Sequence, residues 1–199
     1  MKKAPIFTPV PETPEQVKKY IKSAADREKK MGESLAQELV TVGFEKGYIL
    51  DAGCGTGERT IELAETFPES KVVGLDLSQP LLEKAQKKAA HINNCTFQRG
   101  DVQAMPFEDD SFDVVININM LHVVEDPVAM LNEIERVLKP HGLLGLGDLK
   151  RSWMGYILTP LKKAYTAEEA KELLQQSNLR SWEFTETRFW FRVKTGNDE

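Results

Sequence analysis

The chain has 199 residues, with 26 lysines and arginines against 31 aspartates and glutamates, which gives a formal net charge of −5. A chain of this length buries roughly 70% of the surface that its unfolded form exposes, so it needs no disulfide or metal to fold. Because binding to nucleic-acid phosphates requires clustered lysines and arginines, and no dense cluster is present, we expect no nucleic-acid partner.

The apolar runs and the cysteines bear on the compartment. No run approaches the ~20 apolar residues of a membrane-spanning helix, and prolines at positions 5, 9, 11 and 14 interrupt any signal-peptide core. Cys54 and Cys95 lie in no C-x-x-C or histidine-rich setting, so we expect free thiols and no bound metal. A reducing, cytoplasmic location without membrane contact is the expectation.

The beginning of the chain predicts a leader followed by helices. Residues 1–14 contain four prolines and are expected to be flexible. Residues 15–42 carry two apolar stripes separated near Gly32, which predicts two short helices, with a lid as one role open to them. A single domain is expected over residues 15–195, with a tail at 196–199.

From Gly47 onward, short aliphatic runs alternate with helical patterns, which is typical of βαβ units and a parallel sheet. A capping box that starts at Thr166 predicts a helix to about Gln176, and the aromatic end of the chain predicts a terminal hairpin. The other predicted strands are 48–51, 71–76, 96–100, 112–118 and 143–148, and the other predicted helices are 58–67, 80–91 and 127–138.

The segment Asp51-Ala52-Gly53-Cys54-Gly55-Thr56-Gly57-Glu58 leaves a predicted strand and enters a predicted helix. Glycines at such a turn let a ligand approach the backbone, and the unpaired amides of a helix start attract an anion. A dinucleotide fingerprint needs Gly or Ala where Glu58 stands, which disfavours a nicotinamide-dependent oxidoreductase. No Lys-Ser or Lys-Thr follows the loop, which excludes a P-loop for ATP.

These residues resemble the first motif of class I S-adenosylmethionine-dependent methyltransferases, in particular the type 11, ubiquinone-biosynthesis-like small-molecule branch. Further motifs follow in the family's order at 74–78, 100–115 and 121–142, so the resemblance covers a core at 47–148. It implies a Rossmann-like α/β fold, with helices on both faces of a mostly parallel seven-stranded sheet that ends in an antiparallel hairpin. It also implies S-adenosyl-L-methionine as cofactor and S-adenosyl-L-homocysteine as product.

The resemblance also assigns roles to residues. Asp51 would face the cofactor's ammonium group directly or through water. Asp76 would accept hydrogen bonds from both ribose hydroxyls because a carboxylate has two acceptor oxygens. Asp76 as a helix cap is the alternative, although Ser78 is better placed for capping. The remaining cofactor residues implied by the family pattern are Gly53, Cys54, Gly55 and Gly57 in the loop, Leu77, Asp101 and Val102 at the adenine, and Asn117 beside the sulfonium.

His122 is the candidate catalytic residue. It follows the predicted strand 112–118, near the edge where open α/β sheets bind ligands. It either binds the acceptor or removes a proton from it, or else packs or forms hydrogen bonds within its loop. The apolar segment 149–165 predicts a lid or an acceptor-pocket wall, or else a short helix over the sheet. Tyr20 of the first predicted helix either closes over the cofactor or packs on the apolar face of its helix.

Two functions from different classes remain open. The first is methyl transfer to a small-molecule acceptor, because Asn117-Ile118-Asn119-Met120 lacks the prolines of the base-methylating motif. The second is a non-catalytic sensor or scaffold that binds S-adenosylmethionine. The aromatic terminal hairpin also offers a surface for a homodimer.

Overall fold

A computed structural model of the protein describes residues 10–151 and 164–195. The chain divides into two compact units. Of the described residues, the N-terminal unit comprises 10–102 and 112–114, and the C-terminal unit comprises 103–111, 115–151 and 164–195. The segment 1–9, most of the predicted 149–165 segment and the tail lie outside the described residues.

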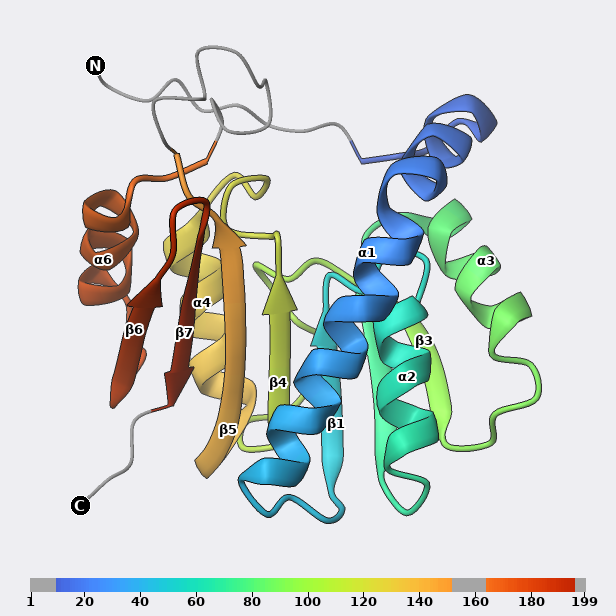
Figure 1. The fold of residues 1–199 in the computed structure, drawn as a ribbon, viewed down its shortest axis with the longest axis horizontal. Coiled ribbons are helices and arrows are strands. Elements are labelled where there is room, and N and C mark those ends of the chain that lie inside the picture. Colours follow the sequence, from blue (N-terminus) through green and yellow to red (C-terminus); the bar gives the residue numbers. More distant parts are fainter. Residues whose placement is uncertain (1–9, 152–163, 196–199) are drawn as a thin grey trace. The chain divides into compact units, whose positions relative to one another are not determined.

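The N-terminal unit carries the first three strands, each followed by a helix or loop (Figure 1). Its elements in chain order are α1 (Pro14–Thr41), β1 (Tyr48–Ala52), α2 (Glu58–Thr66), β2 (Lys71–Asp76), α3 (Gln79–Lys88) and β3 (Cys95–Arg99). β2 pairs in parallel with β1 on one side and with β3 on the other. The connections from β1 to β2 and from β2 to β3 both run toward the same edge of the sheet, so right-handed crossovers place α2 and α3 on the same face of these strands. The helix α1 packs against α2.

The helix α1 corrects the prediction of two short helices. It is one continuous helix of 28 residues, begun by a capping box between Thr13 and Gln16 with Pro14 in the first turn. A Cβ added at Gly32 would lie 3.0 Å from Cβ of Glu62 and 3.1 Å from Cα of Arg59, both on α2. The glycine therefore allows two helices to pack closely, and this tertiary contact outweighs its weak helix propensity.

The C-terminal unit is built on an antiparallel group of strands. Its elements are α4 (Pro127–Val137), β5 (Leu138–Leu149), α6 (Ala167–Gln176), β6 (Trp182–Glu186) and β7 (Trp190–Thr195). β7 pairs antiparallel with both β5 and β6, which confirms the terminal hairpin. The predicted caps are also confirmed, since Asp126 begins α4 and the Thr166–Glu169 capping box begins α6.

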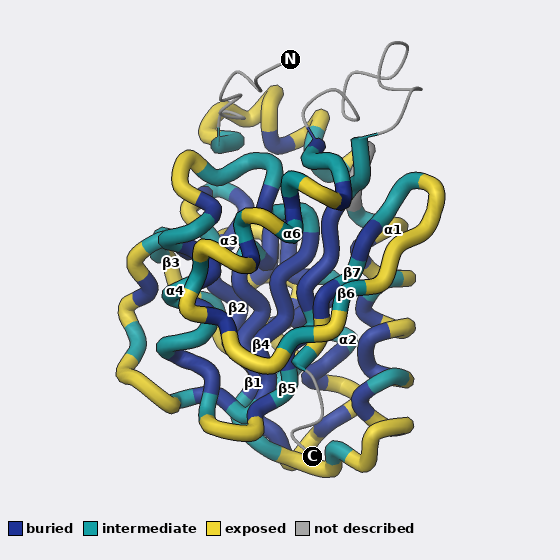
Figure 2. The backbone as a smooth tube through the Cα atoms, turned by 90° about the vertical axis from the view of Figure 1, so that its left-hand side faces the viewer, coloured by how far each residue is buried: buried dark blue, intermediate teal, exposed yellow. Residues whose placement is uncertain are grey.

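The strand β4 (Phe112–Ile118) contributes residues to both units, and the seven-stranded sheet has the order β3-β2-β1-β4-β5-β7-β6. This mostly parallel sheet with an antiparallel end confirms the expected fold class. Strands β1, β2 and β4 are buried along nearly their whole length, as the dark tube in Figure 2 shows. Among the described residues, no helix has both the length and the apolar character needed to cross a membrane.

Candidate functional site

The glycine loop joins β1 to α2 in the N-terminal unit. Gly53, Gly55 and Gly57 have φ angles of 85°, 58° and 79°, in the left-handed region that side chains rarely adopt. The amides of Gly53 and Cys54 both donate to the carbonyl oxygen of Leu75 in β2, at 2.8 and 3.0 Å. The loop is therefore held to the end of β2, and only glycine meets its backbone angles without strain.

The third glycine is packed by the protein's own side chains. A Cβ at Gly57 would lie 2.8 Å from Ala85 of α3 and 2.8 Å from the Phe97 ring of β3. Gly57 also begins α2 without any side-chain cap. Close packing at the start of α2 thus accounts for this glycine, and its predicted contact with a ligand stays a prediction.

Asp76 lies at the end of β2 and is fixed by the glycine loop. Its Oδ2 accepts the amide of Gly55 at 2.9 Å, and its Oδ1 accepts the amide of Ser78 at 2.8 Å. Burial raises the pKa of this carboxyl, and the two backbone hydrogen bonds partly oppose that shift. A carboxylate offers about four lone-pair sites, so acceptor capacity remains for the two hydroxyls of a ribose.

The neighbours of Asp76 agree with the predicted adenosine side of a site. Ser78, and not Asp76, caps α3. Leu77 is 40% exposed, which is high for a large apolar side chain. The amide of Gly100 donates to the carbonyl oxygen of Asp76 at 3.1 Å, so the part-exposed Asp101 and the buried Val102 follow β3 at the same strand edge.

Asp51 has a different environment from the one the sequence suggests. Its side chain has no exposed surface, and its Oδ1 accepts from Nε and Nη2 of Arg59 at 2.9 and 2.5 Å. Its Oδ2 accepts the hydroxyl of Thr60 at 2.7 Å. Arg59 is itself 2% exposed. Burial lowers the pKa of its guanidinium, but the charge and hydrogen bonds of Asp51, together with the charges of Glu28 and Tyr20, raise it on balance. The carboxylate of Asp51 thus already forms an ion pair with a buried cation, and its predicted contact with an ammonium group stays a prediction.

Tyr20 of α1 lies over the loop, which agrees with one of its two predicted roles, and its partner Glu28 was not predicted as a site residue. Tyr20 Oη would lie 2.5 Å from a Cβ at Gly55, and it donates a hydrogen bond to Glu28 Oε1 at 2.6 Å. Glu28 is only 6% exposed. The sequence did contain a signal for Glu28. The successive spacings of 11, 7 and 4 residues from Val17 through Glu28 and Leu35 to Leu39 place this charged residue on the apolar face of the helix.

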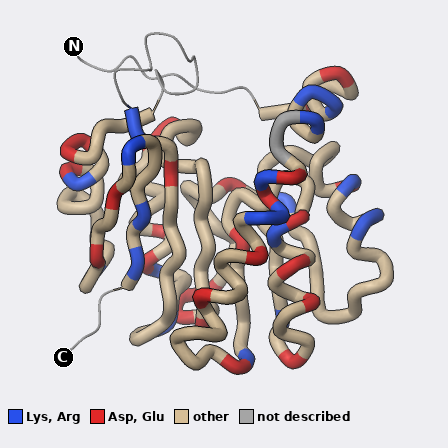
Figure 3. Tube along the Cα trace, in the orientation of Figure 1, with Lys and Arg blue, Asp and Glu red and all other residues tan. Residues whose placement is uncertain are grey.

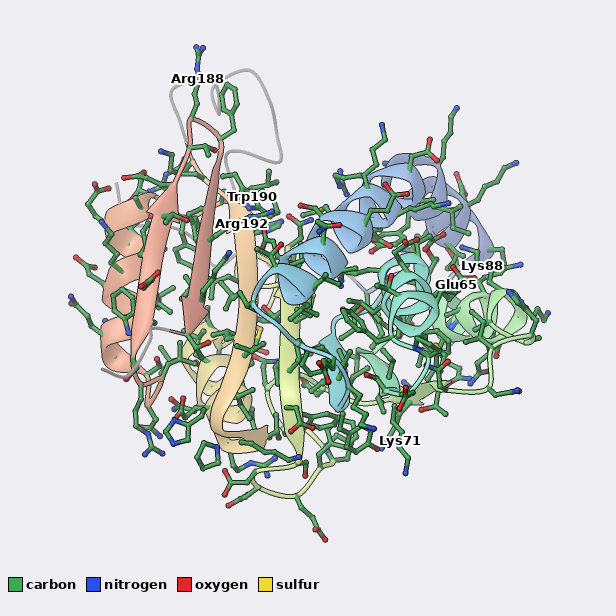
Figure 4. All side chains as sticks on the ribbon, turned by 60° about the horizontal axis from the view of Figure 1, so that its bottom comes forward. Glu65, Lys71, Lys88, Arg188, Trp190 and Arg192 are labelled. Carbon is green, nitrogen blue, oxygen red and sulfur yellow. The ribbon has the colours of Figure 1, made fainter. Side chains whose placement is uncertain are left out.

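The rim of the loop is polar and carries both signs of charge. Lys88 of α3, labelled in Figure 4, pairs with Glu58 of α2. The hydroxyl of Thr56 also donates to Glu58. Figure 3 shows lysines, arginines, aspartates and glutamates interspersed on α1 and α2, so no single sign dominates this surface.

The C-terminal unit contains the candidate catalytic histidine. His122 Nδ1 lies 2.5 Å from Oδ1 of Asp148, and the backbone amide of His122 donates to Oδ2 of Asp148 at 3.0 Å. Asp148 is 1% exposed and also accepts the amide of Leu149. Because a carboxylate only accepts hydrogen bonds, Nδ1 is the donor in this contact, and in a neutral imidazole Nε2 then keeps its lone pair.

Asn117, the other predicted residue of this unit, is buried. It is 1% exposed, and its Nδ2 lies 3.6 Å from the sulfur of Met130 on α4. Asn119 follows β4 with a φ of 61°, donates its amide to the carbonyl oxygen of Gly147, and has a buried Oδ1 without a hydrogen-bond partner among the described residues. Asn119 was not predicted as a site residue, and its strained backbone marks it as one to test.

Trp190 covers the strand beside Asp148. A Cβ at Gly147 of β5 would lie 2.9 Å from the Trp190 ring, and Figure 4 labels Trp190 together with Arg192 on β7. The indole therefore needs a glycine below it. In the aromatic hairpin, which was predicted as a dimer surface, this side chain packs against a strand of its own unit.

The parallel strands, the crossover helices and the glycine loop define a Rossmann-like fold with a nucleotide-type site. A family model described as a methyltransferase domain matches residues 44–189. The chain belongs to this methyltransferase-domain family, as the sequence motifs predicted.

Two curated relatives match the central part of the chain. An uncharacterized methyltransferase of Schizosaccharomyces pombe is 42% identical over 102 residues, which cover 47% of this chain and 37% of that protein. A demethylmenaquinone methyltransferase of Staphylococcus aureus is 41% identical over 105 residues, which cover 52% of this chain and 44% of that protein. The match spans less than half of the length of either relative.

Solved structures resemble almost the whole chain. A SAM-dependent methyltransferase from Aquifex aeolicus has a TM-score of 0.75 at 22% identity and covers 92% of this chain and 97% of its own. A putative S-adenosyl-L-methionine-dependent methyltransferase from Methanococcus maripaludis has a TM-score of 0.72 at 22% identity, with coverages of 93% and 94%. At these identities, the likeness concerns the fold.

Proposed function

We propose that this protein transfers a methyl group from S-adenosyl-L-methionine to a small-molecule acceptor. Membership of the methyltransferase-domain family supports the reaction class. The hydrogen bond from the Gly55 amide to Asp76 is the observation on which the proposal rests, because it couples the glycine loop to the carboxylate that would bind the ribose.

The residues of the N-terminal unit suit the cofactor by their chemistry. The left-handed loop brings bare backbone to the surface at the part-exposed Gly53. Asp76 supplies two acceptor oxygens that its backbone donors already orient. Leu77 supplies exposed apolar surface for a purine, and Asp101 and Val102 would bind the base through carboxylate and amide. Asp51 would act through Arg59 and Thr60, as the buried support of the loop.

Methyl transfer from a sulfonium requires the protein mainly to position the two reactants. A sulfonium is an activated methyl donor for in-line displacement, and holding the acceptor in line supplies on the order of 7 to 11 kcal/mol. Where the accepting atom carries a proton, Nε2 of His122 would remove it as the methyl group arrives. Asp148 would then hold the imidazole in the correct tautomer and stabilise its charged form. Such a base contributes roughly 10²- to 10⁴-fold to the rate.

The acceptor is proposed to be a small organic molecule. The relative from S. aureus is named for methylating demethylmenaquinone, which makes a quinol one class to include in a screen. The segment around 149–165 is proposed to form part of the acceptor pocket; its described ends are joined by the Arg151 amide, which donates to the carbonyl oxygen of Tyr165 at 2.8 Å. We further propose that residues 15–195 act as one catalytic domain in the cytoplasm.

The experiment that tests the proposal has two stages. Isothermal titration with S-adenosylhomocysteine is expected to show one saturable site, and a nicotinamide dinucleotide is expected to show none. Transfer of a labelled methyl group is then screened over thiol, amine, hydroxyl and quinol acceptors. Tight binding of the dinucleotide without binding of S-adenosylhomocysteine would refute the proposal, and binding without turnover of any acceptor would favour a sensor.

A further inference from the structure

The buried charges around the glycine loop do not balance. Asp51 and Glu28 are buried carboxylates. Among the described residues beside them, Arg59 supplies a buried positive charge. Arg59 directs both Nε and Nη2 to Asp51, and Nη2 also reaches the carbonyl oxygen of Gly53. The ion pair of Asp51 and Arg59 is thus complete, and it leaves Glu28 as a second buried acid.

Glu28 is only half satisfied. Its Oε1 accepts the hydroxyl of Tyr20, but its Oε2 is buried and has no hydrogen-bond partner among the described residues. An ionised carboxylate can accept about four hydrogen bonds, and leaving a buried one unpaired is costly. Burial raises the pKa of Glu28; Tyr20 and Arg59 oppose this rise, while Glu58 and Asp51 add to it. A cation at Oε2 would remove the imbalance.

The position of Glu28 connects it to the proposed cofactor site. Tyr20, its hydrogen-bond partner, lies against Gly55 in the middle of the loop. The ligand group expected at this loop is an amino-acid tail, which brings one ammonium group with three donors. Asp51, the acid that the motif offers to this group, is already paired with Arg59 and Thr60.

We propose that Glu28 of α1 binds the ammonium group of the cofactor's amino-acid tail through Oε2, the carboxylate oxygen that has no partner within the described part of the chain. This inference rests on the proposed function. Because Oε2 has no exposed surface, the tail reaches it as the Tyr20 ring turns away from Gly55. The ammonium group then donates to Oε2, and α1 becomes part of the cofactor site.

The test compares ligands that differ in this one group. Wild-type protein and the isosteric Glu28→Gln variant are titrated with S-adenosylhomocysteine, with its deamino analogue and with 5′-methylthioadenosine, which lacks the tail. Glu33→Gln is the matched control, because Glu33 is an exposed acid on the same helix. Wild type and the control should bind S-adenosylhomocysteine about 10- to 100-fold more tightly than the deamino analogue. Glu28→Gln should lose this preference and bind 5′-methylthioadenosine as wild type does.

The outcomes separate the two proposals. If Glu28→Gln keeps the wild-type preference for the ammonium group, the role of Glu28 is overturned while the proposed function stands. If wild-type protein binds none of the three nucleosides, both are overturned. Equal binding of 5′-methylthioadenosine by the two proteins shows that the variant retains a folded adenosine site, so a lost preference is a local effect.

Discussion

The contact between Tyr20 and Gly55 can be tested by adding one methyl group. In Gly55→Ala, the new Cβ would lie 2.5 Å from Tyr20 Oη, where no stable contact exists. The phenol must move away from the new methyl group, which disturbs its 2.6 Å hydrogen bond to Glu28. The alanine must also adopt a φ of 58°, which adds backbone strain.

These effects set the expected magnitude. A left-handed non-glycine residue costs about 1–2 kcal/mol, and loss of a hydrogen bond to a charged group costs about 1.5–3 kcal/mol. Gly43→Ala is the matched control, because Gly43 has a φ of 80° and a Cβ there would meet nothing within 4 Å. We therefore expect Gly55→Ala to lower the free energy of unfolding by roughly 1.5–3 kcal/mol more than Gly43→Ala does.

Urea denaturation followed by tryptophan fluorescence measures both variants, with the slope of the transition checked for constancy. The excess loss should disappear when Gly55→Ala is combined with Tyr20→Ala, because the clash then has no partner. Equal destabilisation by Gly55→Ala and Gly43→Ala would refute the placement of α1 over the loop.

Three further predictions concern the charged residues. Asp76→Ala should weaken S-adenosylhomocysteine binding by about 1.5–3 kcal/mol in a calorimetric titration, and unchanged affinity would remove Asp76 from the site. The variant should also have a lower free energy of unfolding, because the Gly55 and Ser78 amides lose their acceptor. Asp148→Asn should slow single-turnover methyl transfer to a protonated acceptor by roughly 10²- to 10⁴-fold. Cofactor affinity should be retained, because Asp148 acts through the His122 imidazole. An unchanged rate would contradict a base at His122. The raised pKa of Glu28 means that the folded state binds more protons than the unfolded state between the two pKa values, so this group makes stability fall as pH rises. The stability of Glu28→Gln relative to wild type should therefore increase from pH 4 toward pH 8 in urea titrations, and a constant difference would show that Glu28 does not titrate in this way.

Local patterns were sufficient to predict most of the sheet. The bounds of β2 and β4 agree with prediction at both ends, and β1 and β3 differ by one residue at their ends. These strands are short aliphatic runs between glycines or helix caps, so the sequence itself marks where they stop. β5 begins five residues earlier than predicted, at Leu138, because the backbone extends directly from the end of α4 without the expected turn.

Tertiary contacts explain what could not be predicted. Gly32 reads as a helix breaker in the sequence, but in the fold it is the point where α1 meets Arg59 and Glu62 of α2. Nothing in the spacing of residues indicates that Arg59 would neutralise Asp51, since that depends on how α2 lies against β1. For the same reason, Glu28, more than 20 residues before the loop, could not be assigned to it, and Tyr20 could be placed near the cofactor only as one of two alternatives.

The candidate catalytic pair shows the same division. His122 was predicted from its place after β4, and Asp148 was predicted only as the end of a strand. Their contact joins residues 26 positions apart, which a pattern of local spacing does not reveal. The acid was visible in the sequence as a charge that ends an aliphatic strand, which is the signal to use in similar chains.

Calorimetric titration of the purified protein with S-adenosylhomocysteine tests the cofactor assignment most directly, with Asp76→Ala titrated in parallel. One site per chain, weakened at least about 10-fold by the substitution, is the result that the fold and the loop predict. Absence of binding at millimolar ligand, from protein whose cooperative unfolding shows it to be folded, would contradict it.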